Sequence, residues 1–88
     1  MKKNINILNT KPRKIWEFRE YQKGSLLENG IVLNETATFI YKLCDGNKKV
    51  SEIIEKILEN YEVNQGKAKV DTVDCIKELF NANAIKLK

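Results

Sequence analysis

The sequence predicts an α+β fold in which a three-stranded antiparallel β-meander is followed by three α-helices. Apolar residues alternate with period two before Asn34 and recur with a period near 3.6 after it. A third observation is the length, because 88 residues leave room for one compact core only. We therefore expect one domain, residues 13–88, preceded by a flexible basic N-terminal arm at residues 1–12.

The predicted meander begins with a strand over residues 14–21, where Trp16 and Phe18 alternate with charged residues. Its second and third strands, 25–28 and 31–33, flank the dipeptide Asn-Gly. This dipeptide between apolar pairs is typical of a two-residue hairpin turn, in which both central residues adopt positive φ.

A two-residue turn also predicts the register of the hairpin. Leu27 would face Val32, and Leu26 would face Leu33. Leu26, Ile31 and Leu33 would then share one side of the sheet, and Leu27 and Val32 the other. The third strand would lie at an edge of the sheet.

The first helix is predicted over residues 33–46. Asn34 can cap its first turn through the side-chain oxygen, and Gly46 can adopt the left-handed conformation that ends a helix. Its apolar side is expected in the core, where Cys44 serves packing rather than reactivity.

Two further helices follow. The second, 50–61, repeats apolar residues at i, i+3, i+4, i+7, i+8 and i+11. A linker at 62–67 leads to a third helix from about residue 68 to 81, which Asn83 is expected to terminate before a short closing strand at 85–87. The buried face of the third helix is assigned to Thr72, Val73, Ile76, Leu79 and Phe80.

Composition excludes several functional classes. The net charge is +4, and the first 23 residues alone hold seven Lys or Arg against two Glu, so the basic excess belongs to the arm and first strand, most simply as a solvated segment. No apolar run has the length of a signal peptide or a membrane span, so we expect a cytoplasmic protein without a membrane partner. Cys44 and Cys75 lie far apart in a chain without histidine, which excludes a zinc site and a CxxC pair and predicts reduced thiols.

An enzyme is disfavoured for related reasons. The chain has no histidine, no Gly-rich phosphate loop and no carboxylate pair that spacing places in one pocket. We expect no catalytic residue and no cofactor or metal.

Residues 12–87 resemble the PqqD-like proteins of pyrroloquinoline quinone biosynthesis, also known as recognition elements of ribosomally made, modified peptides (RiPP recognition elements). The resemblance rests on three segments in family order and spacing: VLNETATFIYKLCDG (32–46), VSEIIEKILENYEV (50–63) and VDTVDCIKELFNANAI (70–85). It implies a small winged-helix-like domain.

The sequence departs from the family pattern at two places. Lys49 stands where the family often has a Thr that caps the second helix, which moves the expected cap to Asn47 or Ser51. Asn83 and Ala84 replace the usual Gly-Leu, which affects only the last helical turn.

The resemblance implies a binding function without catalysis. Family members hold the leader segment of a precursor peptide as an added strand, against the third helix, and present it to a modifying enzyme, often a radical S-adenosylmethionine enzyme. The residues that this would assign to peptide binding are Leu27, Ile31, Val32, Leu33, Lys67, Asp71, Asp74, Cys75 and Glu78.

The residues themselves supply both walls of such a site. The third strand carries no Lys, Pro or bulge to protect its edge, which suits strand addition. The edge could instead be covered by the N-terminal arm or by a second copy, and we expect a monomer or weak homodimer. Asp71, Asp74 and Glu78 form an acidic stripe that either is a solvated face or borders the groove and selects basic or hydroxyl-bearing leader residues.

The main alternative is a winged-helix DNA-binding regulator, with the third helix as recognition helix. Two features oppose it and favour a protein without a nucleic-acid partner. The linker 62–67 is longer than a helix-turn-helix allows, and an acidic stripe would face the phosphates.

Overall fold

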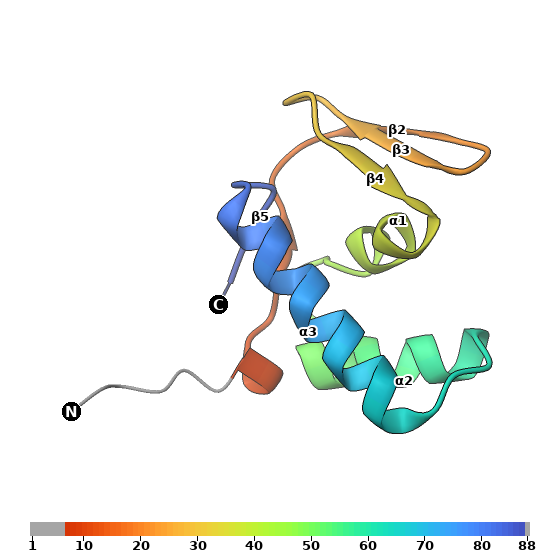
Figure 1. Cartoon of the computed structure of the whole chain (residues 1–88). Helices are drawn as coiled ribbons and strands as arrows, with labels where there is room; N and C mark the ends of the chain where they lie inside the picture. Colours follow the sequence, from red (N-terminus) through yellow and green to blue (C-terminus); the bar gives the residue numbers. More distant parts are fainter. Residues whose placement is uncertain (1–6, 88) are drawn as a thin grey trace.

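The meander expected in the N-terminal half is present in the computed structural model, which describes residues 7–87 (Figure 1). Strands β2 (Phe18–Tyr21), β3 (Gly24–Leu27) and β4 (Val32–Asn34) form an antiparallel sheet in the order β2-β3-β4. Three helices follow in the chain, and the predicted α+β fold is confirmed. The strand β4 lies at one edge of the sheet and next to α1.

The strand predicted over residues 14–21 is interrupted, and this part of the prediction is wrong. Its first part, β1 (Arg13–Lys14), leaves the meander and pairs with β5 (Ile85–Lys86), which confirms a short closing strand. The break falls at Trp16, whose backbone N–H donates to the hydroxyl of Tyr41 instead of to a strand.

The β3–β4 hairpin has a three-residue loop, so the predicted two-residue turn is also wrong. The N–H of Gly30 donates to the carbonyl of Leu27 at 2.9 Å, and the N–H of Leu27 donates to the carbonyl of Ile31 at 2.8 Å. Gly30 has φ +95°, whereas Asn29 does not have a positive φ. This is a type I turn followed by a glycine bulge, the other common loop for this dipeptide.

The longer loop shifts the register by one residue. Leu26 faces Val32 and Ser25 faces Leu33. A shift of one residue moves every side chain to the other face. Leu27 and Leu33 therefore both point into the core, while the side chains of Leu26 and Val32 are 44% and 64% exposed on the outer face.

Helix α1 (Glu35–Lys42) begins as predicted, because the side-chain oxygen of Asn34 accepts the N–H of Ala37 at 2.8 Å. It ends earlier than predicted, at Lys42 with Leu43 as the C-cap, and not at Gly46. Gly46, with φ +83°, belongs to the following loop.

Helix α2 (Val50–Asn60) is capped at Lys49, not at Asn47 or Ser51 as predicted. The backbone N–H of Lys49 donates to the carboxylate of Glu52 at 2.7 Å. An acidic residue at the third helical position therefore provides the cap that the Lys side chain cannot.

Helix α3 (Gln65–Asn81) starts three residues before the predicted position. The side-chain oxygen of Asn64 accepts the N–H of Lys67 at 2.7 Å and so caps a first turn that contains a glycine. Only Tyr61–Asn64 separate α2 from α3, so the predicted long linker is wrong. The predicted end is confirmed, because Asn83 has φ +61° and closes the helix.

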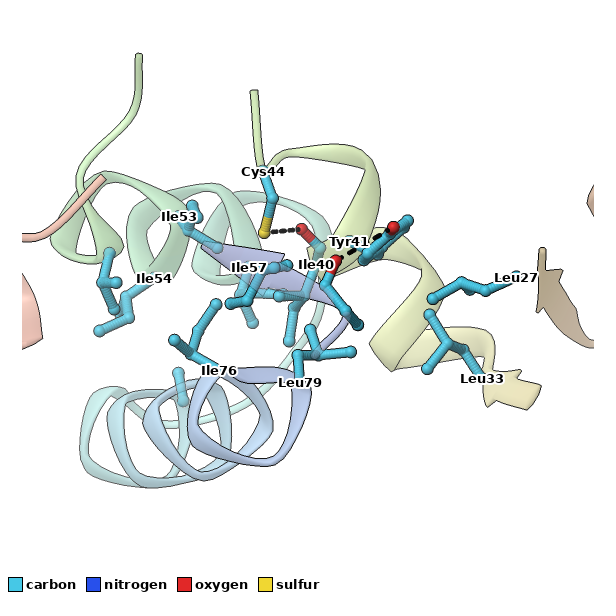
Figure 2. Close-up of a cluster of buried hydrophobic side chains, with 14 residues drawn as sticks. Leu27, Leu33, Ile40, Tyr41, Cys44, Ile53, Ile54, Ile57, Ile76 and Leu79 are labelled. Carbon is cyan, nitrogen blue, oxygen red and sulfur yellow. Dashed lines mark hydrogen bonds between the residues drawn. The ribbon is translucent and has the colours of Figure 1, made fainter. Parts of the chain in front are cut away.

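The core extends from Leu27 and Leu33 on the inner face of the sheet into the space among the three helices (Figure 2). The apolar stripe of α2 is buried as predicted, apart from a partly buried Leu58 and an exposed Tyr61. Phe80, which was assigned to the buried face of α3, is 48% exposed. The 3-10 turn η1 (Ile7–Asn9) lies against α2, and the N–H of Val50 donates to the carbonyl of Thr10. The described end of the predicted arm thus packs on the domain, while residues 1–6 lie outside the described residues.

Candidate functional site

One side of β4 is open for hydrogen bonding. In an antiparallel ladder, hydrogen-bonded pairs alternate with non-bonded pairs. Leu27 and Ile31 form a bonded pair at the loop, so the next pair, Leu26 and Val32, is a non-bonded one. The backbone N–H and C=O of Val32 therefore point away from β3, toward the free edge of the sheet.

A hollow with an apolar lining lies between this edge and α3. It has a volume of about 220 Å³ and is called the apolar hollow below. Three elements supply its walls: β4 and its preceding residue, one residue of α1, and the C-terminal half of α3. The lining residues are Ile31, Val32, Leu33, Ala37, Cys75, Glu78, Leu79 and Ala82.

A second hollow of about 340 Å³ continues the first toward the N-terminus of α3. It is called the acidic hollow, because three carboxylates line it. Its lining residues are Asn34, Thr36, Ala37, Ile40, Asp71, Asp74, Cys75 and Glu78. Ala37, Cys75 and Glu78 belong to both hollows, so the two form one groove beside β4, the β4–α3 groove.

The carboxylates of the groove differ in their charge partners. Asp71 forms an exposed ion pair with Lys67, one turn earlier on α3, at 3.1 Å. Asp74 and Glu78 form no ion pair with any residue among 7–87. The groove therefore keeps two exposed negative charges available to a ligand.

Cys75 lies where the two hollows meet. Burial, with a smaller contribution from the nearby Glu78 carboxylate, raises the pKa of its thiol to about 11. A thiol with this pKa is protonated at neutral pH and is a poor nucleophile. Cys75 therefore contributes apolar surface to the groove.

The structure places the nine sequence-predicted site residues unequally. Seven of them line the groove, in one hollow or both: Ile31, Val32, Leu33, Asp71, Asp74, Cys75 and Glu78. Leu27 is 1% exposed, so its side chain belongs to the core and cannot contact a peptide. Lys67 lines neither hollow and reaches the site only through Asp71.

Three residues that line the apolar hollow were not assigned to the site from sequence, and the acidic hollow adds Asn34, Thr36 and Ile40. Ala37 and Ala82 leave the space that forms the apolar hollow, and Leu79, assigned to the core, also contributes its floor. Small residues on the apolar side of an amphipathic helix are the sequence signal for such a hollow. Only the register of β4 shows which of these small residues lies beside the edge of the sheet.

Other site types have no support in the part of the chain that is described. Within residues 7–87 no three His, Cys, Asp or Glu side chains gather as metal ligands. Within the same range no helix is long and apolar enough to cross a membrane.

A small α+β domain with an open strand edge beside an apolar groove has the geometry of a domain that binds peptides by strand addition. The family model described as coenzyme PQQ synthesis protein D (PqqD) matches residues 24–85, which is well over half of the chain. The chain therefore belongs to the PqqD family, and every residue that lines the groove lies inside the matched range. No curated protein and no solved structure was found to match the chain.

Proposed function

We propose that this protein binds the leader segment of a ribosomally made precursor peptide as an additional strand on β4 and presents it to a peptide-modifying enzyme. Membership of the PqqD family supports a precursor-peptide-binding partner of such an enzyme. The observation that carries the mechanism is the orientation of Val32, whose backbone N–H and C=O face the free edge beside the groove.

The domain itself does no chemistry in this proposal. Its thiols have raised pKa values, and its groove offers backbone hydrogen bonds, an apolar hollow and two free carboxylates. The chemistry belongs to the partner, for which we propose a radical S-adenosylmethionine enzyme. Open reading frames for a short peptide and for such an enzyme beside the gene would support this partner.

Alternative occupants of the edge have less support. The described end of the N-terminal arm, Ile7–Asn9, lies against α2 and not on β4. The other alternative is a weak homodimer in which two copies pair through β4. Sedimentation with and without peptide tests it, because a peptide that binds the same edge would dissociate the dimer.

Proline at Val32 tests the proposal. It removes the N–H that faces the ligand, and because edge strands tolerate Pro where that N–H faces solvent, it leaves the β3–β4 ladder intact. The probe is a fluorescent peptide of about ten residues, longer than a typical strand, selected on the full chain from a randomised display library. We expect Val32→Pro to weaken peptide binding about tenfold, because it removes one backbone hydrogen bond to the added strand.

The opposite edge of the sheet provides a matched control. Glu28 donates its N–H to the carbonyl of Glu17 at 3.0 Å, and the same alternation places the N–H of Glu20 at the free edge of β2. Glu20→Pro should leave peptide affinity unchanged, and Val32→Thr should retain most of it. Equal binding by wild type and Val32→Pro, with helical circular dichroism unchanged in both, would show that β4 is not the template.

One observation favours the second candidate, a winged-helix DNA-binding protein. The connection Tyr61–Asn64 between α2 and α3 is as short as a helix-turn-helix requires. Against it, Asp71, Asp74 and Glu78 are exposed on α3, where a recognition helix would meet phosphates. Salt-dependent binding of an arbitrary labelled DNA duplex, unaffected by Val32→Pro, would favour this candidate over peptide binding.

A further inference from the structure

The two hollows of the β4–α3 groove are offset along α3 by about one helical turn. The α3 residues of the acidic hollow are Asp71, Asp74, Cys75 and Glu78. Those of the apolar hollow are Cys75, Glu78 and Leu79, together with the C-cap residue Ala82. The centres of these two sets are about four residues apart, which is roughly 6 Å along a helix axis.

This offset matches the side-chain spacing of an extended peptide. Side chains on one face of a strand recur every second residue, at about 6.7 Å. A strand added to β4 would therefore place one side chain in the apolar hollow and the neighbour on the same face in the acidic hollow.

The order of the two side chains follows from the direction of the strand. β4 runs from Val32 beside the apolar hollow to Asn34, which lines the acidic hollow. All pairs in this sheet are antiparallel, and antiparallel addition is the slightly more stable mode. An antiparallel ligand passes the acidic hollow first and the apolar hollow two residues later.

The charge of the acidic hollow selects the first of these side chains. Asp74 and Glu78 lie one turn apart on α3, are exposed, and have no cationic partner within residues 7–87. Asp71 is already neutralised by Lys67 and contributes less. A Lys or Arg of the ligand would supply the missing positive charge, while an acidic residue would be repelled.

We propose that the peptide recognised by this groove carries a Lys or Arg two residues before an apolar residue, with the basic side chain between Asp74 and Glu78 and the apolar one against Leu79 and Ala82. This motif rests on strand addition to β4, the proposed function. It goes further by giving the chemistry, spacing and direction of the ligand.

A selection experiment on the full-length protein tests the motif. A randomised peptide display library is selected on wild type, on the double variant Asp74→Lys/Glu78→Lys, and on the control Glu55→Lys/Glu59→Lys. The control makes the same charge change one turn apart on α2, at exposed residues that line neither hollow. Enriched peptides are then resynthesised and measured for affinity on each variant and on Val32→Pro.

Wild type and the control variant should enrich Lys or Arg two residues before Leu, Ile, Val, Met or Phe. The groove variant should keep the apolar residue and replace the basic one by Asp or Glu. Exchange of the basic residue for Ser in a selected peptide should weaken wild-type binding by about twofold to fivefold at low salt, as expected for an exposed pair.

The possible failures are distinct. Peptides that depend on Val32 but show no basic preference, or show it after the apolar residue, would overturn the motif and leave strand addition in place. Enrichment that Val32→Pro does not affect would overturn both. An unchanged basic preference in the groove variant would place its source outside Asp74 and Glu78 and also overturn the motif.

Discussion

The hydroxyl of Tyr41 is bonded to the backbone of Trp16 on both sides. It accepts the Trp16 N–H at 3.1 Å and donates toward the Trp16 carbonyl at 3.0 Å, with the carbonyl of Ala84 at 3.3 Å as a second acceptor. One side chain of α1 thus holds the segment that interrupts the first strand, and fixes the point where β1 and β2 diverge. The side chain is fully buried, which also raises the pKa of this hydroxyl above 10.0.

Tyr41→Phe should therefore destabilise the protein by about 1 to 3 kcal/mol, the cost of leaving a buried donor without a partner. Urea unfolding followed by Trp16 fluorescence measures the loss. Tyr61→Phe is the control, because Tyr61 is exposed at the end of α2 and its hydroxyl forms no hydrogen bond with the described residues. Equal stability of wild type and Tyr41→Phe would mean that water satisfies the Trp16 N–H.

Gly30→Ala tests the three-residue loop. The φ of +95° costs an L-residue roughly 1 to 2 kcal/mol, and no atom lies within 4 Å of the added Cβ, so the whole effect is conformational. Gly66→Ala, in the first turn of α3, is the matched control. It has ordinary helical geometry and should stabilise by about 0.5 to 1 kcal/mol. The thermal unfolding midpoints of the two variants should shift in opposite directions. A higher midpoint for Gly30→Ala would contradict the positive φ of Gly30 in this loop.

Core and groove residues should separate in a comparison of stability with affinity. Ile57 of α2 is buried in the core, so Ile57→Ala should lower the free energy of unfolding by about 2 to 5 kcal/mol. Cys75→Ser, at a partly buried groove position, should reduce the affinity for a selected peptide more than the unfolding midpoint. Equal destabilisation by the two changes would assign Cys75 to the core.

The stability of the protein should decline above about pH 9 because of the buried thiols. Burial raises the pKa of Cys44 from 9.0 to about 12, and that of Cys75 from 9.0 to about 11. A thiol whose pKa is higher in the folded than in the unfolded state contributes stability. This contribution is complete below about pH 9 and is lost as the pH rises toward the folded-state pKa.

The urea midpoint should therefore fall between pH 9 and the folded-state pKa values of about 11 and about 12. Cys44→Ala should show a shallower fall than wild type, which separates the thiol from the lysines that titrate in the same range. A parallel pH profile of the two proteins would contradict this contribution of Cys44.

The spacing of apolar residues identified the meander and the three helices, because burial of one face imposes this spacing independently of the loops. Loop geometry was harder. Asn-Gly fits both a two-residue turn and a three-residue loop with a glycine bulge, and the sequence around Gly30 does not distinguish them. That single ambiguity exchanged the faces of β3: the predicted register grouped Leu27 with Val32, whereas in the structure Leu27 faces the core.

Helix ends show the same limit. The start of α3 was placed too late because Gly66 reads as a loop residue, whereas the Asn64 cap and the packing of Ala68 outweigh its poor helix propensity. The acidic residues of the groove were found because i, i+3 and i+7 share a helix face. The apolar hollow beside them was not identified from sequence, because it depends on the small side chains of Ala37 and Ala82.

The position of Val32 has a consequence for the other half of a bound peptide. Its side chain and that of Leu26 lie on the outer face of the sheet, 64% and 44% exposed, while the groove is on the α3 side. Alternate residues of an added strand would extend this outer face and remain uncovered by the domain. The same stretch of peptide would then carry two sets of side chains, one that the groove recognises and one that is exposed to the partner enzyme. Each set could change in evolution without altering the other.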